Sequence, residues 1–445
     1  MNEFLTKITS FSEREAICYK NRTFTYSELA KSIDFFYQII AGSIPKGSVT
    51  ILNSDLTFEG LALFFALHHN KCIIVPVTSD TEDMQTRAMH SGAGYILQPG
   101  GNSINVEILA PGKKIDLYRE ILEAEHGGLV LFSSGITGTP KGMVHDLDIL
   151  MQPFLNKKVK SINFMALLMF DHIGGLNTVL SSVFSGALLS IPDKREPFSI
   201  CETIEKYKVG VLPASPTFLN LILISGAYEK YDLSSLKVIT YGTEPMPEGL
   251  LHKLNRIFPS VRFLQTFGTS ETGISQITSK SSGSTKLRFD DPNIKYKIVD
   301  GELWIKSPTT IKGYLNAAMD QFTTDGWFKT GDLAEIDEEG YFLITGRKNE
   351  IINVGGLKVY PQEVESVIME FEGIIDCLVK AESNPITGNI VIALIYAGKN
   401  TDKKTFVSSL RKFLITRLDR YKVPVKIRFV DSIEHNERFK KIRSI

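Results

Sequence analysis

The sequence lacks the cysteine patterns that mark disulfide scaffolds and zinc sites. Its 445 residues include four cysteines, Cys18, Cys72, Cys201 and Cys377, and no CxxC pair. Cysteines this far apart argue against a disulfide framework and a structural zinc site. They fit a reducing compartment such as the cytoplasm.

The sequence also lacks net charge and long apolar runs. Fifty basic and fifty acidic residues cancel, so no overall field draws the chain to nucleic acid or to an anionic membrane. No apolar run reaches the roughly 18–20 residues that span a bilayer, and residues 1–16 carry charges where a signal peptide is apolar. We therefore expect a cytoplasmic globular protein of two or more domains, without nucleic-acid partners or membrane insertion.

A loop rich in glycine and hydroxyl groups follows a short apolar run. Residues 129–132 are predicted to form a buried strand. The loop after it reads SSGITGTPKG and contains Ser133, Ser134, Gly135, Thr137, Gly138 and Lys141. Glycines let successive N–H groups face one concavity, and hydroxyls and a lysine add donors and charge, which suits a polyphosphate. A flexible surface loop has a similar composition, so composition alone leaves both interpretations open.

The first half of the chain alternates strand-like and helical segments. Residues 48–52 and 72–77 are predicted strands around an apolar helix at 61–67, a pattern typical of a parallel α/β layer. Such sheets bind ligands at the carboxyl ends of their strands, where the glycine-rich loop is expected. Thr25, three residues before Glu28, predicts a capped helix start.

Two later strands are predicted to end in polar side chains beside glycines. A strand at 166–170 leads to Asp171 and His172, and this histidine is either structural or borders a pocket. Ser270 and Glu271 follow a strand that begins at residue 262. A carboxylate beside hydroxyls and close to a phosphate loop is a natural magnesium ligand. The same two residues also suit a helix N-terminus.

From residue 301 onward, the alternation of strand-like and helical segments gives way to short strands and turns. Short strands and turns there predict a small antiparallel β region. A helix at 359–369, strands at 376–381 and 390–396 and a helix at 401–418 form an α+β unit of about a hundred residues. The fold class is therefore α/β. We expect a large N-terminal domain, residues 1–347, of α/β layers plus the small β region, and a smaller α+β C-terminal domain, residues 348–445.

Five motifs, in this order, resemble the adenylate-forming superfamily of acyl-CoA synthetases, peptide-synthetase adenylation domains and luciferases. They are SSGITGTPKG, YGTEPMP, FGTSETG, KTGDLAEIDEEGYFLITGRKNE and VGGLKVYPQEVE. The resemblance implies a two-step reaction. A carboxylate attacks the α-phosphate of ATP to give an acyl-adenylate and pyrophosphate. The thiol of coenzyme A, or of a carrier protein's phosphopantetheine, then takes the acyl group.

The resemblance also implies roles for residues at the nucleotide site. Thr137 and Lys141 would hold the β- and γ-phosphates, Ser270 would contact the α-phosphate and Glu271 would bind Mg²⁺. Asp332 would accept both ribose hydroxyls, a task that suits a carboxylate, and Arg347 would reach the ribose or a phosphate. The backbone of Gly242 and Thr243 and the ring of Phe267 would hold the adenine. Glu244 and Gly268, in the same two motifs, would also belong to the nucleotide site. Glu244 either recognises a polar group of the substrate or caps a turn.

The family's catalytic lysine lies near the C-terminus in a motif of the form T/N-x-x-G-K-x-x-R. Asn436, Lys440 and Arg443 keep this spacing, with Phe439 in place of the glycine. Lys440 is therefore predicted to bridge the substrate carboxylate and the α-phosphate. Lys441 is the alternative.

The resemblance further implies that the C-terminal domain is mobile. After the first step it would swing, withdraw the lysine and open a channel for the thiol. Gly355, Gly356 and Lys358 would belong to that second conformation. The chain departs from the family at Ile136, where the phosphate loop usually has a hydroxyl, and at Asn349, the hinge position.

The stretch HIGGLNTVLSSVFSG resembles the FHIxGLN segment of aryl- and acyl-CoA synthetases. His172 and Gly175 would line the acid pocket, with Thr217 and Tyr241 in other walls. The amino-acid branch uses an aspartate in an FDxS stretch, of which Asp171 matches only the first half. An aromatic or small-to-medium acyl acid is therefore favoured. An enzyme that loads a carrier protein and a nucleotide-binding subunit without catalysis are the two alternatives.

Overall fold

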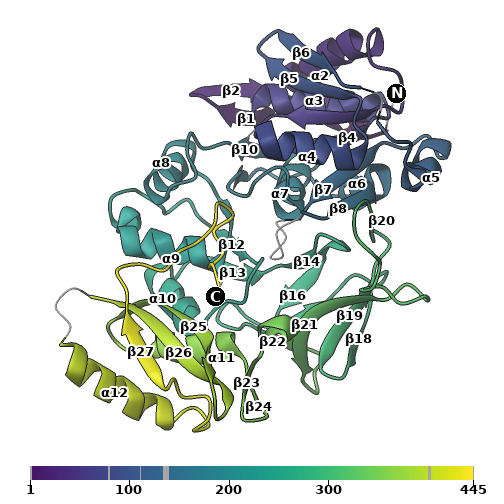
Figure 1. Ribbon diagram of the computed structural model, residues 1–445. Coiled ribbons are helices and arrows are strands. Elements are labelled where there is room, and N and C mark those ends of the chain that lie inside the picture. The colour runs from purple at the N-terminus through teal and green to yellow at the C-terminus, as the bar shows by residue number, and fades with distance from the viewer. Residues whose placement is uncertain (1–2, 79–80, 111, 134–139, 399–401, 444–445) are drawn as a thin grey trace.

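The computed structural model describes residues 3–78, 81–110, 112–133, 140–398 and 402–443. Figure 1 shows a large domain, coloured purple to green, and a smaller yellow-green domain packed below it. Among the described residues, no helix is long and apolar enough to cross a membrane.

The first sheet of the large domain carries the glycine-rich loop. Its strand order is β20-β8-β7-β4-β3-β5-β6. The strands are β3 (Val49–Asn53), β4 (Ile73–Val77), β5 (Tyr95–Gly100), β6 (Ser103–Ile108), β7 (Gly128–Phe132), β8 (Gly142–Asp146) and β20 (Gly313–Tyr314). β3 and β4 pair in parallel around α3 (Phe58–His69), as predicted. β7 and β8 form an antiparallel pair, so the loop connects two neighbouring strands of this sheet.

The other helices of the first half are α1 (Glu3–Thr9), α2 (Tyr26–Ala41), α4 (Thr81–Ser91), α5 (Arg119–Glu123) and α6 (Leu147–Leu155). Of these, α4 packs on β4 and β8, and α6 packs on β7 and β8. The predicted capping box is present: Thr25 accepts from the Glu28 amide and the Glu28 carboxylate accepts from the Thr25 amide. α3 is buried on nearly every side, because it packs between α2 and the strands.

The second sheet has the order β13-β12-β11-β9-β10-β1-β2. Its strands are β1 (Glu15–Tyr19), β2 (Arg22–Thr25), β9 (Asn163–Met165), β10 (Leu188–Ser190), β11 (Val211–Ala214), β12 (Val238–Tyr241) and β13 (Arg262–Gln265). Its helices are α7 (Ile173–Val183), α8 (Pro197–Tyr207), α9 (Pro216–Ser225) and α10 (Glu248–Ile257). The strand predicted at 166–170 is wrong: β9 ends at Met165, and an irregular segment leads to α7.

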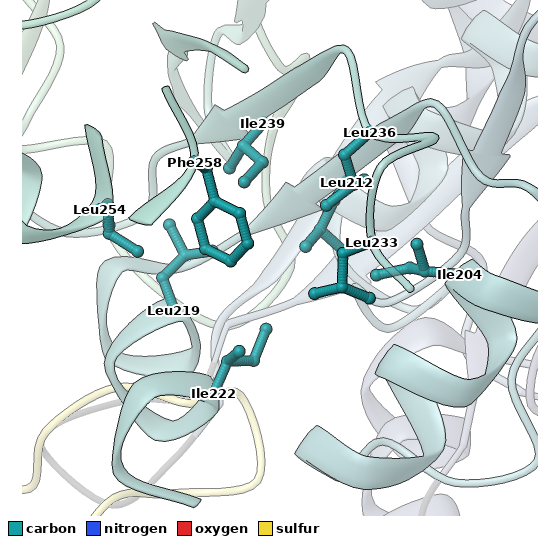
Figure 2. Close-up of a pocket in the computed structure, with 9 residues that line it drawn as sticks. All are labelled: Ile204, Leu212, Leu219, Ile222, Leu233, Leu236, Ile239, Leu254 and Phe258. Carbon is teal, nitrogen blue, oxygen red and sulfur yellow. The ribbon is translucent and has the colours of Figure 1, made fainter. Parts of the chain in front are cut away.

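A small enclosed space lies in the core beside the second sheet. Figure 2 shows the nine apolar side chains around it, among them Leu212, Leu219 and Phe258. Its volume of about 10 Å³ is close to that of one water molecule. Because its walls offer no polar partner, it is a packing defect rather than a ligand site.

The predicted antiparallel β region is a six-stranded sheet with the order β16-β17-β22-β21-β19-β18. The strands are β16 (Ile277–Ser279), β17 (Leu287–Phe289), β18 (Lys295–Val299), β19 (Glu302–Lys306), β21 (Phe328–Ile336) and β22 (Phe342–Arg347). A short hairpin of β14 (Phe267–Thr269) and β15 (Gly273–Ser275) precedes it. Ser270 and Glu271 lie in the turn of this hairpin, so the alternative that they begin a helix is wrong.

The small domain is an α+β unit, as the sequence indicated. It contains β23 (Ile352–Val354), β24 (Leu357–Val359), α11 (Pro361–Glu370), β25 (Ile374–Asn384), β26 (Gly388–Ala397), α12 (Lys403–Ile415) and β27 (Lys426–Phe429). The chain passes from the six-stranded sheet to this domain between Arg347, where β22 ends, and Ile352, where β23 begins. After β27 the yellow segment leaves the small domain and runs beside α9 of the large domain (Figure 1).

Candidate functional site

A cavity of about 1100 Å³ lies between the two domains. The large domain contributes residues that follow β11, β12 and β14, including Thr217, Glu244 and Glu271. The small domain and the C-terminal segment contribute Glu365 and Lys440. The cavity therefore gathers residues that are far apart in the sequence, at the ends of strands where α/β sheets bind ligands.

The two ends of the glycine-rich loop meet beside this cavity. The Ser133 amide donates to the Lys141 carbonyl at 3.0 Å, and the Lys141 amide donates to Ser133 Oγ at 3.3 Å. Asn316 holds the loop's end: it accepts from the Gly142 amide and donates to the Pro140 carbonyl. Ser134, Gly135, Ile136, Thr137 and Gly138, which carry part of the phosphate-site prediction, lie outside the described residues.

Glu271 lines the cavity from the turn of the β14–β15 hairpin. Tyr314 donates its hydroxyl proton to Glu271 Oε1 at 3.0 Å, and Lys141 Nζ lies 5.6 Å from the centre of the Tyr314 ring. Tyr314 thus links the carboxylate to the loop lysine. No sequence pattern indicated this tyrosine, because it belongs to none of the five motifs.

The geometry around Glu271 suits one kind of magnesium site. Among the described residues, no group of three or more His, Cys, Asp or Glu side chains could hold a metal ion. Mg²⁺ is commonly held by one or two carboxylates together with substrate phosphates and water. A single carboxylate beside a phosphate loop fits that arrangement and does not fit a metal cage made by the protein alone.

Asp332 and Arg347 form an ion pair across two neighbouring strands. They face each other in the β21–β22 register, and Arg347 Nε lies 2.8 Å from Asp332 Oδ1. Burial raises the pKa of Asp332 to about 6, although the Arg347 charge opposes the shift. Arg347 lines the cavity. Asp332 lies just behind it, close enough for the charges of Glu271 and Lys440 to affect its pKa.

The YGTEPMP motif forms a tight turn at the cavity wall. Gly242, Thr243 and Glu244 all line the cavity. A side chain at Gly242 would place its Cβ 2.3 Å from Thr266 Oγ1, so only glycine lets this turn approach β13. Thr243 has a left-handed backbone with φ of 71°, which is uncommon outside glycine and points to a constrained loop.

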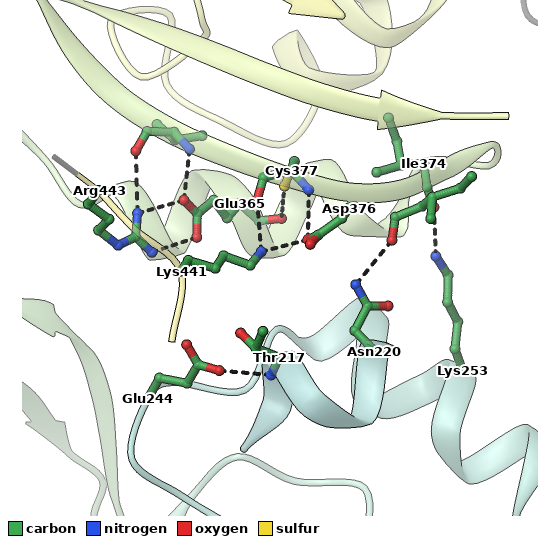
Figure 3. A network of polar contacts seen from close by, with 12 residues as sticks. Thr217, Asn220, Glu244, Lys253, Glu365, Ile374, Asp376, Cys377, Lys441 and Arg443 are labelled. Carbon is green, nitrogen blue, oxygen red and sulfur yellow. Dashed lines mark hydrogen bonds and ion pairs between the residues drawn. The ribbon is translucent and has the colours of Figure 1, made fainter. Parts of the chain in front are cut away.

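Glu244 caps α9. It is half-buried, and its Oε1 accepts from the Thr217 amide at 2.7 Å, as Figure 3 shows. This amide belongs to the first turn of α9, where backbone donors lack helical partners. Burial raises the pKa of Glu244. Of the two interpretations of Glu244, the structure therefore supports the cap.

The ring of Phe267 lies away from the position that the resemblance implied. It packs edge-on against Phe289 and Phe342, at 5.8 and 6.2 Å between ring centres. These rings form the core of the six-stranded sheet. The next residue, Gly268, does line the cavity. We therefore correct the prediction that the Phe267 ring holds adenine: its side chain is core, and the backbone after it borders the cavity.

His172 borders the cavity at the start of α7. It is the N-cap of this helix, and its Nδ1 accepts from the Gly174 amide at 3.3 Å. Burial, and then the positive charges of Lys440 and Arg438, lower its pKa to about 3. The ring is therefore neutral at physiological pH.

For two predicted wall residues of the acid pocket, the preceding residue in the chain lines the cavity instead. Thr240 lines the cavity, whereas the adjacent Tyr241 is buried in the core on the other side of β12. Side chains alternate along a strand, so an error of one residue exchanges the two faces. Gly174 lines the cavity in place of Gly175. A Cβ at Gly175 would lie 1.9 Å from the Met169 carbonyl oxygen, so this glycine permits close packing.

The two candidate lysines occupy different surroundings. Lys441 Nζ donates to Asp376 at 2.6 Å and to the Cys377 carbonyl at 2.8 Å, both in the small domain (Figure 3). These contacts, with the negative charges of Asp376 and Glu365, raise the pKa of Lys441 although burial opposes the shift. Loss of water lowers the pKa of Lys440.

Lys440 lies among the charges of the nucleotide-site candidates. Arg347 and Arg438 lower its pKa further, whereas Glu244 and Asp332 raise it. Three of these four charged groups, Arg347, Glu244 and Asp332, belong to the large domain. Gly356 and Lys358 lie in the β23–β24 hairpin, where both are exposed.

The sequence comparisons name the family to which a chain with this fold and this cavity belongs. Residues 4–315 match the AMP-binding enzyme family, and residues 363–440 match the C-terminal domain of AMP-binding enzymes. The chain therefore belongs to the AMP-binding enzymes. The second match contains Lys440, and the first contains the glycine-rich loop and Glu271.

Individual relatives and solved structures agree with this assignment. A probable CoA ligase of Humulus lupulus is 30% identical over 351 residues, which are 72% of this chain and 63% of that protein. The 2-succinylbenzoate–CoA ligase of Listeria monocytogenes is 28% identical over 71% of this chain and 68% of that protein. The structure of the anthranilate CoA ligase AuaEII with anthranoyl-AMP has a TM-score of 0.82 at 18% identity, covering 98% of this chain and 95% of that one. The aligned part of this chain thus spans about two thirds of the curated relatives.

Proposed function

We propose that the protein is an AMP-forming acid–thiol ligase. It activates a carboxylic acid with ATP to an acyl-adenylate and then transfers the acyl group to a thiol such as that of coenzyme A. The observation that carries this proposal is the convergence of Glu271, Arg347 and Lys440 on one cavity, from three separate parts of the chain. The family membership and the CoA ligases among the relatives support it.

The first step brings two anions together. Negative charge develops around the α-phosphorus as the carboxylate attacks, so positioned donors and cations lower the barrier. Lys440 would lie between the carboxylate and the α-phosphate. Asp332 would accept from the ribose hydroxyls while Arg347 keeps its carboxylate oriented. Mg²⁺, held by Glu271 and the phosphates, would supply further positive charge.

The substrate class that we propose is an aromatic or small-to-medium acyl acid. A free carboxylate at the position of Asp171 would favour an α-ammonium group. Asp171 is instead buried between Arg87 Nη1, at 3.2 Å, and Arg438 Nη2, at 3.6 Å. Two guanidinium groups neutralise it and repel a third cation. The Listeria relative that acts on 2-succinylbenzoate also supports an aryl acid.

Acid-dependent exchange of labelled pyrophosphate into ATP tests the first step. The panel consists of benzoate, other aryl acids, short and medium fatty acids, and amino acids, each with Mg²⁺. We expect exchange with an aryl or short acyl acid and none with the amino acids. Exchange with none of the acids would contradict the proposal and favour a nucleotide-binding subunit without catalysis.

The acceptor is tested separately with the best acid of the panel. Free coenzyme A and a phosphopantetheinylated carrier protein are offered in parallel reactions, and the thioester is measured by mass spectrometry. We expect the thioester of free coenzyme A. A thioester that forms only on the carrier protein would assign the chain to the carrier-loading enzymes.

A further inference from the structure

The turn that precedes Lys440 is fastened to the large domain by residues outside the catalytic set. Asn436 Oδ1 accepts from the amides of Arg438 and Lys440, each at 3.0 Å. The backbone N–H of Asn436 in turn donates to the backbone carbonyl of Lys440 at 3.0 Å. The backbone N–H of Phe439 donates to the backbone carbonyl of Asn436 at 2.9 Å. The turn therefore satisfies its own polar groups, and its side chains can bind elsewhere.

Phe439 has a backbone conformation that a bulky side chain seldom adopts. Its φ is 53°, in the left-handed region, which costs a residue with a Cβ roughly 1–2 kcal/mol and costs glycine little. A glycine would thus make this turn more easily. The phenylalanine must gain its stability from contacts outside the turn.

Those contacts lie on α9 of the large domain. The Phe439 ring packs edge-on against the buried Phe218 ring, with 4.6 Å between their centres. Ser215 Oγ donates to the Phe439 carbonyl at 2.9 Å and accepts from the Phe218 amide as the N-cap of α9. One hydroxyl therefore joins the start of the helix to the C-terminal segment.

Arg438 makes a second connection between the turn and the large domain. Its Nη2 lies 3.6 Å from Oδ2 of Asp171, which is 2% exposed and also faces Arg87. The other carboxylate oxygen of Asp171 has no hydrogen-bond partner among the described residues. Removing one cation from a buried carboxylate is costly, so Arg438 contributes to holding the segment in place.

We propose that Arg438 and Phe439 are positioning residues that fasten the 436–440 turn to the large domain and so hold Lys440 at the nucleotide site. This inference rests on the proposed function. Both contacts join the C-terminal segment to the large domain, so they must separate before the segment can move away for acyl transfer. Weakening them is therefore expected to slow adenylation and to spare transfer.

The test compares Arg438→Gln and Phe439→Ala with the unchanged 445-residue chain. Arg428→Gln is the matched control, because Arg428 lies in the same domain and pairs with Glu382 at its surface. The first measurement is hydrogen–deuterium exchange without ligands. Both variants should exchange faster in peptides covering 433–443 and 215–223, and the control should not.

The second measurement separates the two half-reactions. With the best acid of the pyrophosphate-exchange panel, each variant should lose about tenfold or more in kcat for adenylation, with KM for ATP within about twofold. Acyl transfer to coenzyme A from a preformed adenylate should be unchanged or faster. Phe439→Tyr, which keeps the ring, should restore the adenylation rate.

The outcomes separate this inference from the proposed function. Unchanged deuterium exchange in both variants overturns it, and so does an equal loss in both half-reactions. If the unchanged protein exchanges pyrophosphate with no acid, the proposed function fails. Deuterium exchange then decides alone whether Arg438 and Phe439 hold the segment on the large domain.

Discussion

Lys441 and Asp376 form an ion pair of 2.6 Å that joins the C-terminal segment to the small domain, and the neighbouring Lys440 lines the same cavity as this pair. Both partners are largely shielded from water. Two neighbouring residues thus have different surroundings: Lys441 pairs with the small domain, and the charges of Arg347, Glu244 and Asp332 in the large domain act on Lys440.

The first prediction concerns these two lysines. Lys440→Ala should lower acid-dependent pyrophosphate exchange by about 10²–10³-fold while ATP still binds, because only the transition-state cation is lost. Lys441→Ala should instead lower the free energy of unfolding by about 3–5 kcal/mol, because Asp376 is left buried and unpaired. Exchange kinetics and denaturant unfolding measure the two effects. The reverse pattern would show that the motif register is wrong by one residue.

The second prediction concerns the pH dependence of nucleoside binding. Asp332 has a pKa of about 6, so at pH 5 only about one molecule in ten keeps it ionised. Adenosine, which has no group that titrates between pH 5 and 8, should bind about tenfold more weakly at pH 5 than at pH 7.5. Calorimetry of the unchanged protein and of Asp332→Asn measures this. If adenosine binding by Asp332→Asn kept the full pH dependence, the assignment of Asp332 to the ribose hydroxyls would be contradicted.

The raised pKa of Asp332 has the opposite effect on stability: low pH weakens nucleoside binding but increases this group's contribution to the free energy of unfolding. The pKa of Asp332 in the folded protein lies above its ordinary value of 3.8, so between pH 6 and pH 4 the folded state binds a proton that the unfolded chain does not. This group's contribution to the free energy of unfolding therefore increases as the pH falls through that window. Weaker binding at pH 5 is thus not a sign of unfolding caused by Asp332.

The third prediction concerns Glu271 and Tyr314. Glu271→Gln should abolish pyrophosphate exchange at millimolar Mg²⁺, because the carboxylate proposed to hold the ion is lost. Tyr314→Phe removes the hydroxyl that donates to Glu271 and should raise the Mg²⁺ concentration for half-maximal exchange by about tenfold. A magnesium titration of both variants measures this. If pyrophosphate exchange by the unchanged protein and by both variants depended equally on the Mg²⁺ concentration, Glu271 would not belong to the metal site.

The fourth prediction concerns packing at the start of α7. Gly175→Ala would place a Cβ 1.9 Å from the Met169 carbonyl oxygen, and backbone cannot yield as a flexible side chain does. We expect a loss of about 3 kcal/mol or more in the free energy of unfolding. Gly42→Ala is the control, since a Cβ there would meet no atom within 4 Å. Equal unfolding midpoints for the two variants would contradict this account.

Local sequence determined the elements and the order of the motifs. The alternation of apolar segments predicted β3, α3 and β4, and the Thr25–Glu28 spacing predicted the start of α2. Both depend on neighbours in the chain, because periodicity and capping act over a few residues. The motif order similarly identified the family before any geometry was known.

Tertiary structure decided which side chains face the cavity. Thr240 and Tyr241 have adjacent positions in one strand, and only the packing of β12 shows which of them is core. Phe267 belongs to a motif, yet the core of the six-stranded sheet holds its ring. Tyr314 reaches Glu271 from 43 residues away, a contact that no local pattern specifies.

By itself, the sequence determined that this is a member of the AMP-binding enzymes and placed a lysine pair near its end. Only the folded chain showed that Lys441 pairs with Asp376 of the small domain, whereas Lys440 lies close enough to Arg347 and Asp332 for their charges to affect its pKa. It also placed Phe439 on α9 and Arg438 beside Asp171. Contacts between residues more than 200 positions apart depend on the packing of the two domains, and that packing has no counterpart in a local sequence pattern.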